Sequence, residues 1–270
     1  MGIRFGLIGC GAMGGMIASA FDGGGIGGAL VAVYDVDVGK ASTLVKRLRD
    51  KPAISSSASD LINSVDFVIE AASQEAVEEY AEETVKAGKN IMIMSVGALL
   101  DEELMGRLIS AAKKSGVGIY LPSGAVAGVD ALLSASAAGI DEITLTSTKP
   151  PAGLKGVKYL TDRGINLDLL TSPTAVYEGP ASEAVKLFPK NINVAAVASL
   201  ASGKDIKVRI VADPKAKTNM HEIHVRGIFG ELTTKTSNVP TPNNPKTSYL
   251  AALSAVATLK KITGVVRIGN

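Results

Sequence analysis

This chain of 270 residues contains no tryptophan, one cysteine and only two histidines. The single cysteine, Cys10, cannot form a disulfide within the chain, and no cysteine–histidine cluster has the spacing of a metal site. We therefore expect no disulfide framework, no bound metal and a cytoplasmic location. Aromatic residues make up only 4% of the chain, so the core must be built mainly from aliphatic side chains and alanine.

Strong charge bias and long apolar runs are also missing. The formal net charge is +2, and the basic residues form no long run, so we expect no nucleic-acid partner. No apolar stretch reaches the roughly 20 residues that a membrane-spanning helix needs, and we expect no membrane association. The length is sufficient for one large domain or two modest ones.

A glycine-rich turn follows the first apolar segment. Residues 9–14 read G-C-G-A-M-G directly after the apolar run 3–8, and a second apolar run, 30–34, ends in Asp35. Strand, glycine turn, helix, strand and acidic residue in this order are typical of a dinucleotide-binding fold. The alternative is an ordinary strand–helix turn that happens to be rich in glycine.

Each residue of the motif has its own expected role. Gly9 permits the tight turn, Gly11 lets a pyrophosphate approach the backbone, and Gly14 lets the helix pack closely on the strand. The start of the helix, at Ala12 and Met13, offers N–H groups to the phosphates.

Asp35 is expected to accept hydrogen bonds from the adenine ribose. Its charge opposes a 2′-phosphate, so NAD is favoured as the cofactor, with NADP still possible.

Strand and helix patterns alternate as far as about residue 120, which predicts a doubly wound parallel sheet of the Rossmann type in an α/β protein. Ligands of such sheets bind at the carboxyl ends of the strands. The expected strands are 3–8, 29–34, 66–71, 90–95 and 117–121. The expected helices are 12–22, 39–50, 75–87 and 101–115.

Beyond residue 128 the strict alternation ends, which predicts an α+β domain with a mixed or antiparallel sheet. We expect strands at 142–148, 207–211, 222–227 and 231–237, and helices at 129–138, 182–202 (interrupted at Pro189) and 247–262. Residues 1–124 are then a dinucleotide-binding domain and 125–246 a substrate and catalytic domain. Residues 247–270 form a C-terminal helix that can pack back on the first domain.

Both histidines lie in one expected strand. Alternation places His221 on the face of Ile223 and Val225, and His224 on the charged face. Because a dehydrogenase needs a general acid/base near neutral pH, His221 is the better candidate. A purely structural histidine is the alternative reading.

Polar residues also gather at the interrupted helix, where Lys190, Asn191 and Asn193 follow Pro189. Donors at such a break can hold carboxylates or a nicotinamide amide, although an ordinary surface loop has the same composition. The hydroxyl-rich segment 146–151, which includes Lys149, can either bind an acidic substrate or be an exposed strand end.

Six segments together resemble the L-aspartate dehydrogenase family, and they span nearly the whole chain in the expected order. They are residues 9–14, Met94-Ser95-Val96-Gly97-Ala98-Leu99, Pro122-Ser123-Gly124-Ala125, Thr148-Lys149-Pro150-Pro151, Phe188-Pro189-Lys190-Asn191-Ile192-Asn193-Val194-Ala195 and Asn219-Met220-His221-Glu222-Ile223. The last two segments are the specific ones.

The resemblance implies that His221 is the catalytic histidine, and that Asn191 and the main-chain amide of Ala125 bind the cofactor. It implies NAD(P)-dependent oxidation of L-aspartate to iminoaspartate, which hydrolyses to oxaloacetate and ammonia. A role in NAD biosynthesis, the reverse reductive amination and a homodimer are further expectations. Ser123, Lys190 and Asn193 are candidates for binding the two substrate carboxylates.

Two other functions remain open from the sequence. One is a related two-domain reductase acting on homoserine or dihydrodipicolinate, although a basic motif for the latter is not evident. The other is a catalytically silent NAD-binding sensor or assembly protein, which would leave the histidine and asparagine–lysine motifs unexplained.

Overall fold

The computed structural model describes residues 2–189, 192–241 and 244–269. The chain divides into two compact units. The first contains Met1–Pro122 and Ala252–Ile268, and the second contains Ser123–Ala251 and Gly269–Asn270. The first unit is therefore built from the N-terminal part of the chain together with a segment near its C-terminus.

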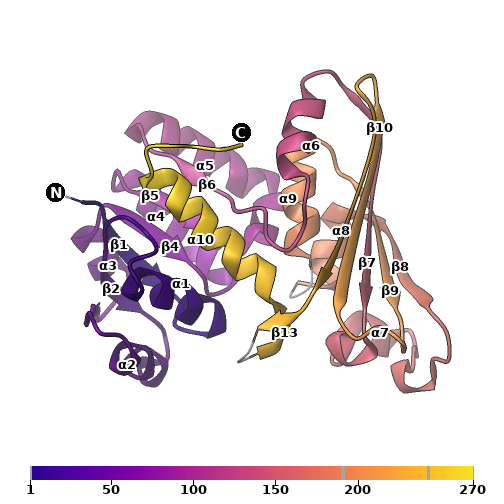
Figure 1. Ribbon diagram of the computed structural model, residues 1–270, viewed down its shortest axis with the longest axis horizontal. Coiled ribbons are helices and arrows are strands. Elements are labelled where there is room, and N and C mark those ends of the chain that lie inside the picture. Colours follow the sequence, from indigo (N-terminus) through magenta and orange to yellow (C-terminus); the bar gives the residue numbers. More distant parts are fainter. Residues whose placement is uncertain (1, 190–191, 242–243, 270) are drawn as a thin grey trace. The chain divides into compact units, whose positions relative to one another are not determined.

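The first unit contains a six-stranded parallel sheet in the order β3-β2-β1-β4-β5-β6 (Figure 1). Its strands are β1 (Arg4–Ile8), β2 (Ala29–Tyr34), β3 (Ala53–Ile54), β4 (Phe67–Glu70), β5 (Asn90–Ile93) and β6 (Ile119–Tyr120). From β1 the chain adds strands first toward β3 at one edge and then, from β4 on, toward β6 at the other edge. Ligands of open α/β sheets bind at the point where this order reverses, between β1 and β4. The prediction of a doubly wound parallel sheet is confirmed.

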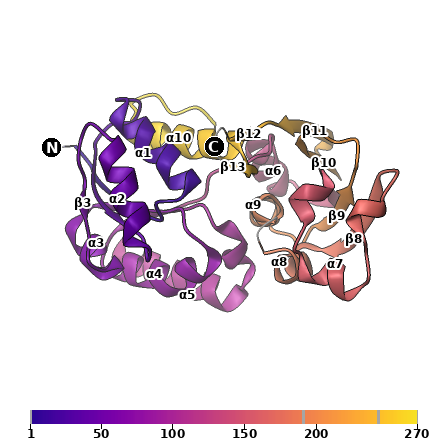
Figure 2. The ribbon, with the colours of Figure 1, turned by 90° about the horizontal axis from the view of Figure 1, so that it is seen from below.

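Helices cover both faces of this sheet (Figure 2). One face carries α1 (Ala12–Asp22), α2 (Val38–Arg47) and α10 (Tyr249–Thr263), and the other carries α3 (Ala58–Ser64), α4 (Gln74–Lys86) and α5 (Glu102–Ser115). A short 3₁₀ helix, η1 (Val96–Leu100), follows β5. The C-terminal helix belongs to the core of the first face, because its Ala255 and Leu259 pack in one cluster with Phe5, Ile17 and Leu44.

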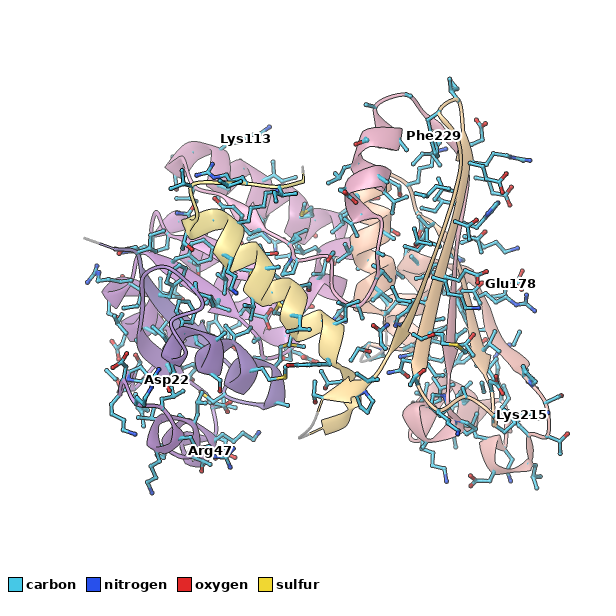
Figure 3. The ribbon with its side chains drawn as sticks, in the orientation of Figure 1. Asp22, Arg47, Lys113, Glu178, Lys215 and Phe229 are labelled. Carbon is cyan, nitrogen blue, oxygen red and sulfur yellow. The ribbon has the colours of Figure 1, made fainter. Side chains whose placement is uncertain are left out.

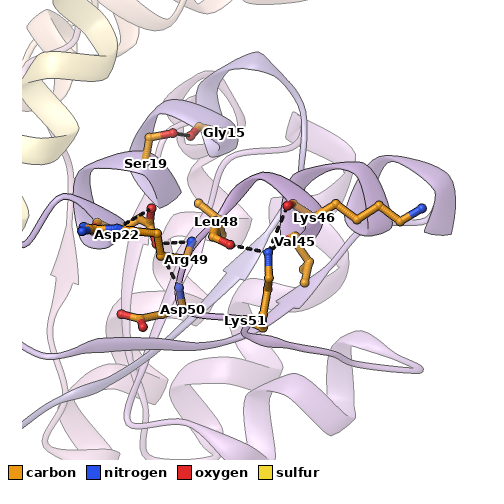
Figure 4. Close-up of polar contacts among 9 residues, drawn as sticks. All are labelled: Gly15, Ser19, Asp22, Val45, Lys46, Leu48, Arg49, Asp50 and Lys51. Carbon is orange, nitrogen blue, oxygen red and sulfur yellow. Dashed lines mark hydrogen bonds and ion pairs between the residues drawn. The ribbon is translucent and has the colours of Figure 1, made fainter.

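Polar contacts tie the end of α1 to the segment that follows α2 (Figure 4). Asp22 Oδ1 accepts hydrogen bonds from the N–H groups of Arg49 (2.6 Å) and Asp50 (3.0 Å). Lys51 Nζ donates to the carbonyls of Val45 (3.0 Å), Lys46 (3.0 Å) and Leu48, which are among the last carbonyls of α2. A cation at this end of a helix satisfies carbonyls that lack helical partners.

The second unit contains a five-stranded sheet in the order β11-β10-β7-β9-β8. Its strands are β7 (Ile140–Lys149), β8 (Thr174–Pro180), β9 (Lys207–Ala212), β10 (Asn219–Gly227) and β11 (Gly230–Asn238). The pair β7–β9 is parallel and the other pairs are antiparallel. The expected mixed sheet is therefore confirmed, and a separate small pair, β12 (Pro240–Thr241) and β13 (Asn244–Ser248), follows it.

Apolar side chains of this sheet face its helices. The helices are α6 (Val129–Ser136), α7 (Lys158–Asp162), α8 (Ala181–Leu187) and α9 (Asn193–Ser202), with the 3₁₀ helices η2 (Pro151–Leu154) and η3 (Leu167–Leu169). Helix α9 is rich in alanine and valine and is buried along most of its length. The opposite face of the sheet carries exposed ion pairs such as Lys207–Glu178 (2.7 Å; Figure 3).

Several short elements were not predicted from the sequence, among them β3, α3 and β8. Strand β3 has two residues and helix α3 only seven, too few for a periodic pattern to be recognised. Strand β8 ends in Gly179-Pro180, residues that normally indicate a turn. The expected helix over 182–202 is observed as two helices, α8 and α9, separated around Pro189.

A buried carboxylate organises the carboxyl ends of β4 and β5. Glu70 is 1% exposed. Its Oε1 accepts from Ala72 N–H and Ser95 Oγ–H (both 2.8 Å), and its Oε2 accepts from the N–H groups of Ser95 (2.9 Å) and Met94 (3.1 Å). Burial raises the pKa of Glu70, and these four donors act in the opposite direction. Both oxygens are thus used as acceptors.

We predict that Glu70→Gln lowers the free energy of unfolding by about 1–3 kcal/mol, because the amide N–H₂ would face N–H donors that need an acceptor. Glu78→Gln, on the exposed face of α4, is the matched control and should stay close to the native value. Urea unfolding of the three proteins measures the effect. Equal stability of the two variants would show that the carboxylate is not needed here.

Candidate functional site

The glycine turn after β1 has little room for side chains at two of its three glycines. Gly9 has φ +100°, and a Cβ there would lie 2.5 Å from the carbonyl oxygen of Ala71. A Cβ on Gly14 would collide with the carbonyl of Gly9. Only glycine fits at both positions, because close backbone packing leaves no space for even a methyl group.

Gly11 differs from its two neighbours. Its φ is −75°, and no atom lies within 4 Å of the position that a Cβ would occupy. Helix α1 begins at Ala12, and its first i→i−4 hydrogen bond runs from Gly15 N–H to Gly11 C=O (2.8 Å). The N–H groups of Ala12, Met13 and Gly14 precede that bond. Open space in front of a helix N-terminus fits the pyrophosphate of a dinucleotide.

Asp35 follows β2 at the same edge of the sheet. Its Oδ2 accepts from Cys10 N–H (2.7 Å) and its Oδ1 from Asp37 N–H (2.9 Å), so the carboxylate is fixed beside the glycine turn while remaining half-exposed. Burial, followed by the charge of Asp35, raises the pKa of the Cys10 thiol to about 12. Cys10 is therefore an unreactive thiol rather than a nucleophile.

Three polar side chains lie together on the inner face of the second unit's sheet. His221, Ser147 and Lys149 are 4%, 3% and 6% exposed. Strands β7 and β10 pair His221 directly with Ser147, and the Ser147 Oγ lies 2.9 Å from the His221 Nδ1. Lys149 is two residues further along β7 and therefore shares this face.

The electrostatics of the three side chains are linked. Burial, followed by the positive charge of Lys149, lowers the pKa of His221 to about 3. Burial also lowers the pKa of Lys149 to about 8. The imidazole is consequently neutral at physiological pH.

His224 lies on the opposite face of β10, as the alternation predicts. Its side chain is 40% exposed, and its Nδ1 lies 3.1 Å from Thr233 Oγ1 and 3.6 Å from Glu231. Because this imidazole is solvated and its neighbours are exposed, His224 is a poor candidate for the acid/base of a buried reaction.

The remaining candidates from the sequence are spread over two segments. Ala125 is buried and Ser123 half-buried in the segment before α6, and Asn193 is the exposed first residue of α9. Lys190 and Asn191 lie outside the described residues. The Ala125 carbonyl accepts from Thr236 Oγ1 and Asn238 Nδ2 (both 2.9 Å), two residues that the sequence analysis did not single out.

Within the described parts of the chain, no group of three or more histidine, cysteine, aspartate or glutamate side chains is arranged to hold a metal ion. No helix in those parts has the length and apolar character needed to cross a bilayer.

Lys149→Met is predicted to raise the free energy of unfolding at pH 7 by about 1–3 kcal/mol, because the folded chain no longer buries a charge. Lys149 has a pKa of about 8 when folded, against 10.5 ordinarily. Below pH 8 the charge is present in both states and its burial destabilises the folded one. The gain should therefore shrink as pH rises from 8 to 10.5, where the unfolded chain also loses its proton.

Urea unfolding at pH 7 and pH 10 measures this difference. Lys204→Met, at an exposed lysine, is the control and should show no such pH dependence. A gain that is the same at both pH values would mean that apolar packing, and not removal of a buried charge, explains it.

Comparisons with known proteins agree over both units. Residues 130–262 match the family model described as aspartate dehydrogenase, C-terminal, and residues 9–122 match the one described as homoserine dehydrogenase, NAD binding domain. L-aspartate dehydrogenase of Methanosarcina acetivorans is 49% identical over 270 residues, covering 99% of this chain and 100% of that protein. The Nitrosopumilus maritimus enzyme of the same name is 47% identical over 262 residues, covering 96% of each chain.

A solved structure supports the same assignment. The crystal structure of aspartate dehydrogenase from Thermotoga maritima matches with a TM-score of 0.75 and 29% identity, covering 99% of each chain. The resemblance seen in the sequence motifs and the expectation of a dehydrogenase are confirmed. The chain belongs to the L-aspartate dehydrogenase family.

Proposed function

We propose that this protein oxidises L-aspartate to iminoaspartate with NAD as the hydride acceptor. The observation that carries the proposal is the buried His221, held by Ser147 beside Lys149, in a chain of this family. A neutral buried imidazole suits a reaction that releases a proton. Incubating the protein with NAD and a panel of amino acids, and following the absorbance of reduced cofactor, tests the proposal directly.

The glycine turn is the proposed binding site for the cofactor phosphates, with Gly9, Gly11, Ala12, Met13 and Gly14 supplying backbone and space. Ala125, through its main-chain amide, and Asn191 are the proposed contacts of the nicotinamide end, by their match to the family motifs. When bound, the nicotinamide ring accepts the hydride from Cα of the substrate.

His221 is proposed to take the proton that the substrate amine must lose as the Cα–H bond breaks and a C=N bond forms. An imidazole that donates from Nδ1–H to Ser147 Oγ keeps its Nε2 lone pair available for that proton. Once the imidazolium has released that proton to solvent, the neutral imidazole can accept a proton from water as the water oxygen adds to the C=N carbon of iminoaspartate. Return of the proton to the nitrogen lets ammonia leave as the C–N bond breaks, which gives oxaloacetate. A positioned acid/base is needed in both steps.

The two substrate carboxylates need cationic or polar partners. Lys149 is a buried cation on the same face as His221 and is one proposed partner. Ser123, Lys190 and Asn193 are the others. In the Lys149→Met variant, the KM for L-aspartate should accordingly rise, even as stability increases.

The wider role of the enzyme is proposed from its family. Iminoaspartate supplied by this reaction can enter NAD biosynthesis, and reductive amination of oxaloacetate is the same chemistry in reverse. A homodimer and a cytoplasmic location remain predictions. The homoserine alternative loses support because residues 130–262 match the aspartate dehydrogenase C-terminal model.

Asp35 is proposed to select NAD by accepting hydrogen bonds from the ribose diol. Asp35→Ala should weaken binding of NAD more than that of NADP, since the change removes a partner for one and a repulsion for the other. Fluorescence titration with both reduced cofactors measures the ratio of dissociation constants. An unchanged ratio would refute this role.

His221→Ala is expected to reduce kcat by about a hundred- to ten-thousand-fold, the usual effect of removing a positioned acid/base. His224→Ala should remain within a few-fold of the native rate, because that imidazole is solvated. The measurement is kcat for L-aspartate oxidation, with NADH binding as evidence that each variant is folded. An active His221→Ala enzyme together with an inactive His224→Ala enzyme would reverse the assignment.

A further inference from the structure

We propose that Thr236 and Asn238 are positioning residues for hydride transfer, because they hold the Ala125 carbonyl, and with it the backbone on both sides of this residue, against the strand that pairs with the strand of His221. The proposal rests on the proposed function, in which the Ala125 amide contacts the cofactor and His221 takes the proton. It assigns a role in the reaction to β11, a strand that none of the expected site residues occupies.

The contact between β11 and the segment before α6 is made by side chains. Thr236 Oγ1 and Asn238 Nδ2 both donate to the Ala125 carbonyl at 2.9 Å, and Thr234 Oγ1 donates to the Ala127 carbonyl at 3.0 Å. Asn238 Nδ2 also lies 3.2 Å from Thr236 Oγ1. Thr234, Thr236 and Asn238 are alternate residues of β11, and they share two carbonyls of the segment, with one donor on Ala127 and two on Ala125.

The segment itself is restricted at both of its ends. Gly124 has φ +71° and Gly128 has φ +87°, values that favour glycine. A Cβ on Gly128 would lie 2.9 Å from Thr234 Cγ2. Residues 125–127 are therefore fixed by two left-handed glycines and by three side-chain donors from one strand.

Strand β11 also pairs with β10, the strand that contains the catalytic candidate His221. His221 pairs with Thr236 in the register of β10 and β11, and Thr236 Oγ1 lies 3.5 Å from the His221 carbonyl as well. Asn238 is only 4% exposed, so its side-chain amide is buried. One threonine thus contacts the carbonyls of two residues: Ala125, whose N–H is proposed to hold the nicotinamide end, and His221, the proposed base.

A positioning role predicts a specific kinetic effect. Rate depends steeply on the alignment of the hydride donor and acceptor, whereas substrate affinity depends on the carboxylate contacts. Removing a hydrogen bond to the Ala125 carbonyl should therefore lower kcat and weaken cofactor binding. The KM for L-aspartate should stay nearly unchanged. The same loss should also make hydride transfer more rate-limiting.

The experiment compares Thr236→Val, Asn238→Ala and the double variant with the native enzyme. Thr236→Ser, which retains the hydroxyl, is the rescue variant, and Ser237→Ala, on the exposed face of β11, is the matched control. The measurements are kcat, the KM for L-aspartate, the NADH dissociation constant, and the isotope effect on kcat with Cα-deuterated L-aspartate.

We expect each single variant to lower kcat about tenfold, in line with the loss of one buried hydrogen bond, and to increase the isotope effect. The losses should be non-additive in the double variant, because both donors serve one carbonyl. Thr236→Ser and Ser237→Ala should behave like the native enzyme.

A purely structural role would lower the melting temperature of Thr236→Val and Asn238→Ala and leave kcat, the isotope effect and NADH binding within about twofold of native; that result would overturn the inference. Failure of the proposed function looks different. The native protein would then fail to oxidise L-aspartate, or His221→Ala would remain active, whatever the β11 variants do.

Discussion

Burial of His221 against the inner face of the five-stranded sheet is the constraint on which the proposed chemistry depends. An imidazole in water titrates near neutral pH, whereas this one is 4% exposed and lies near the charge of Lys149, so the charged form is disfavoured. Its one side-chain partner in β7, Ser147, orients the ring without supplying a negative charge. The site therefore keeps a neutral base at a fixed position. A dicarboxylate bound nearby would supply the negative charge that stabilises the imidazolium.

Carboxylates at the ends of the parallel strands accept hydrogen bonds from backbone N–H groups of the segments that follow. Glu70 accepts four hydrogen bonds from the segments after β4 and β5, and Asp35 accepts two beside the glycine turn. Backbone N–H groups just beyond a strand end often lack a ladder partner, and a side-chain carboxylate can accept from them. Hydrogen bonds to these two carboxylates thus hold the edge where a dinucleotide is proposed to bind.

Local patterns in the sequence were sufficient for most of the fold. The glycine motif, the alternation of apolar runs with helices up to residue 120, and the period of two in β10 predicted the parallel sheet, the mixed sheet and the opposite faces of His221 and His224. These features depend on interactions between neighbours in the chain, so they are visible without the structure. Strands β3 and β8 and helix α3 escaped because short or proline-bounded segments carry too little periodicity.

The sequence by itself determined the glycine turn, the face of each histidine and the membership of a dehydrogenase family. Each of these depends on short motifs whose residues are close together in the chain. Only the tertiary structure decided which side chains surround His221 and Ala125. Ser147 is 74 residues from His221, and Thr236 and Asn238 are 111 and 113 residues from Ala125. Such partners are set by strand register and by the path of the chain between strands. The residues next to a serine, a threonine or an asparagine in the sequence do not indicate which distant atom its side chain will contact.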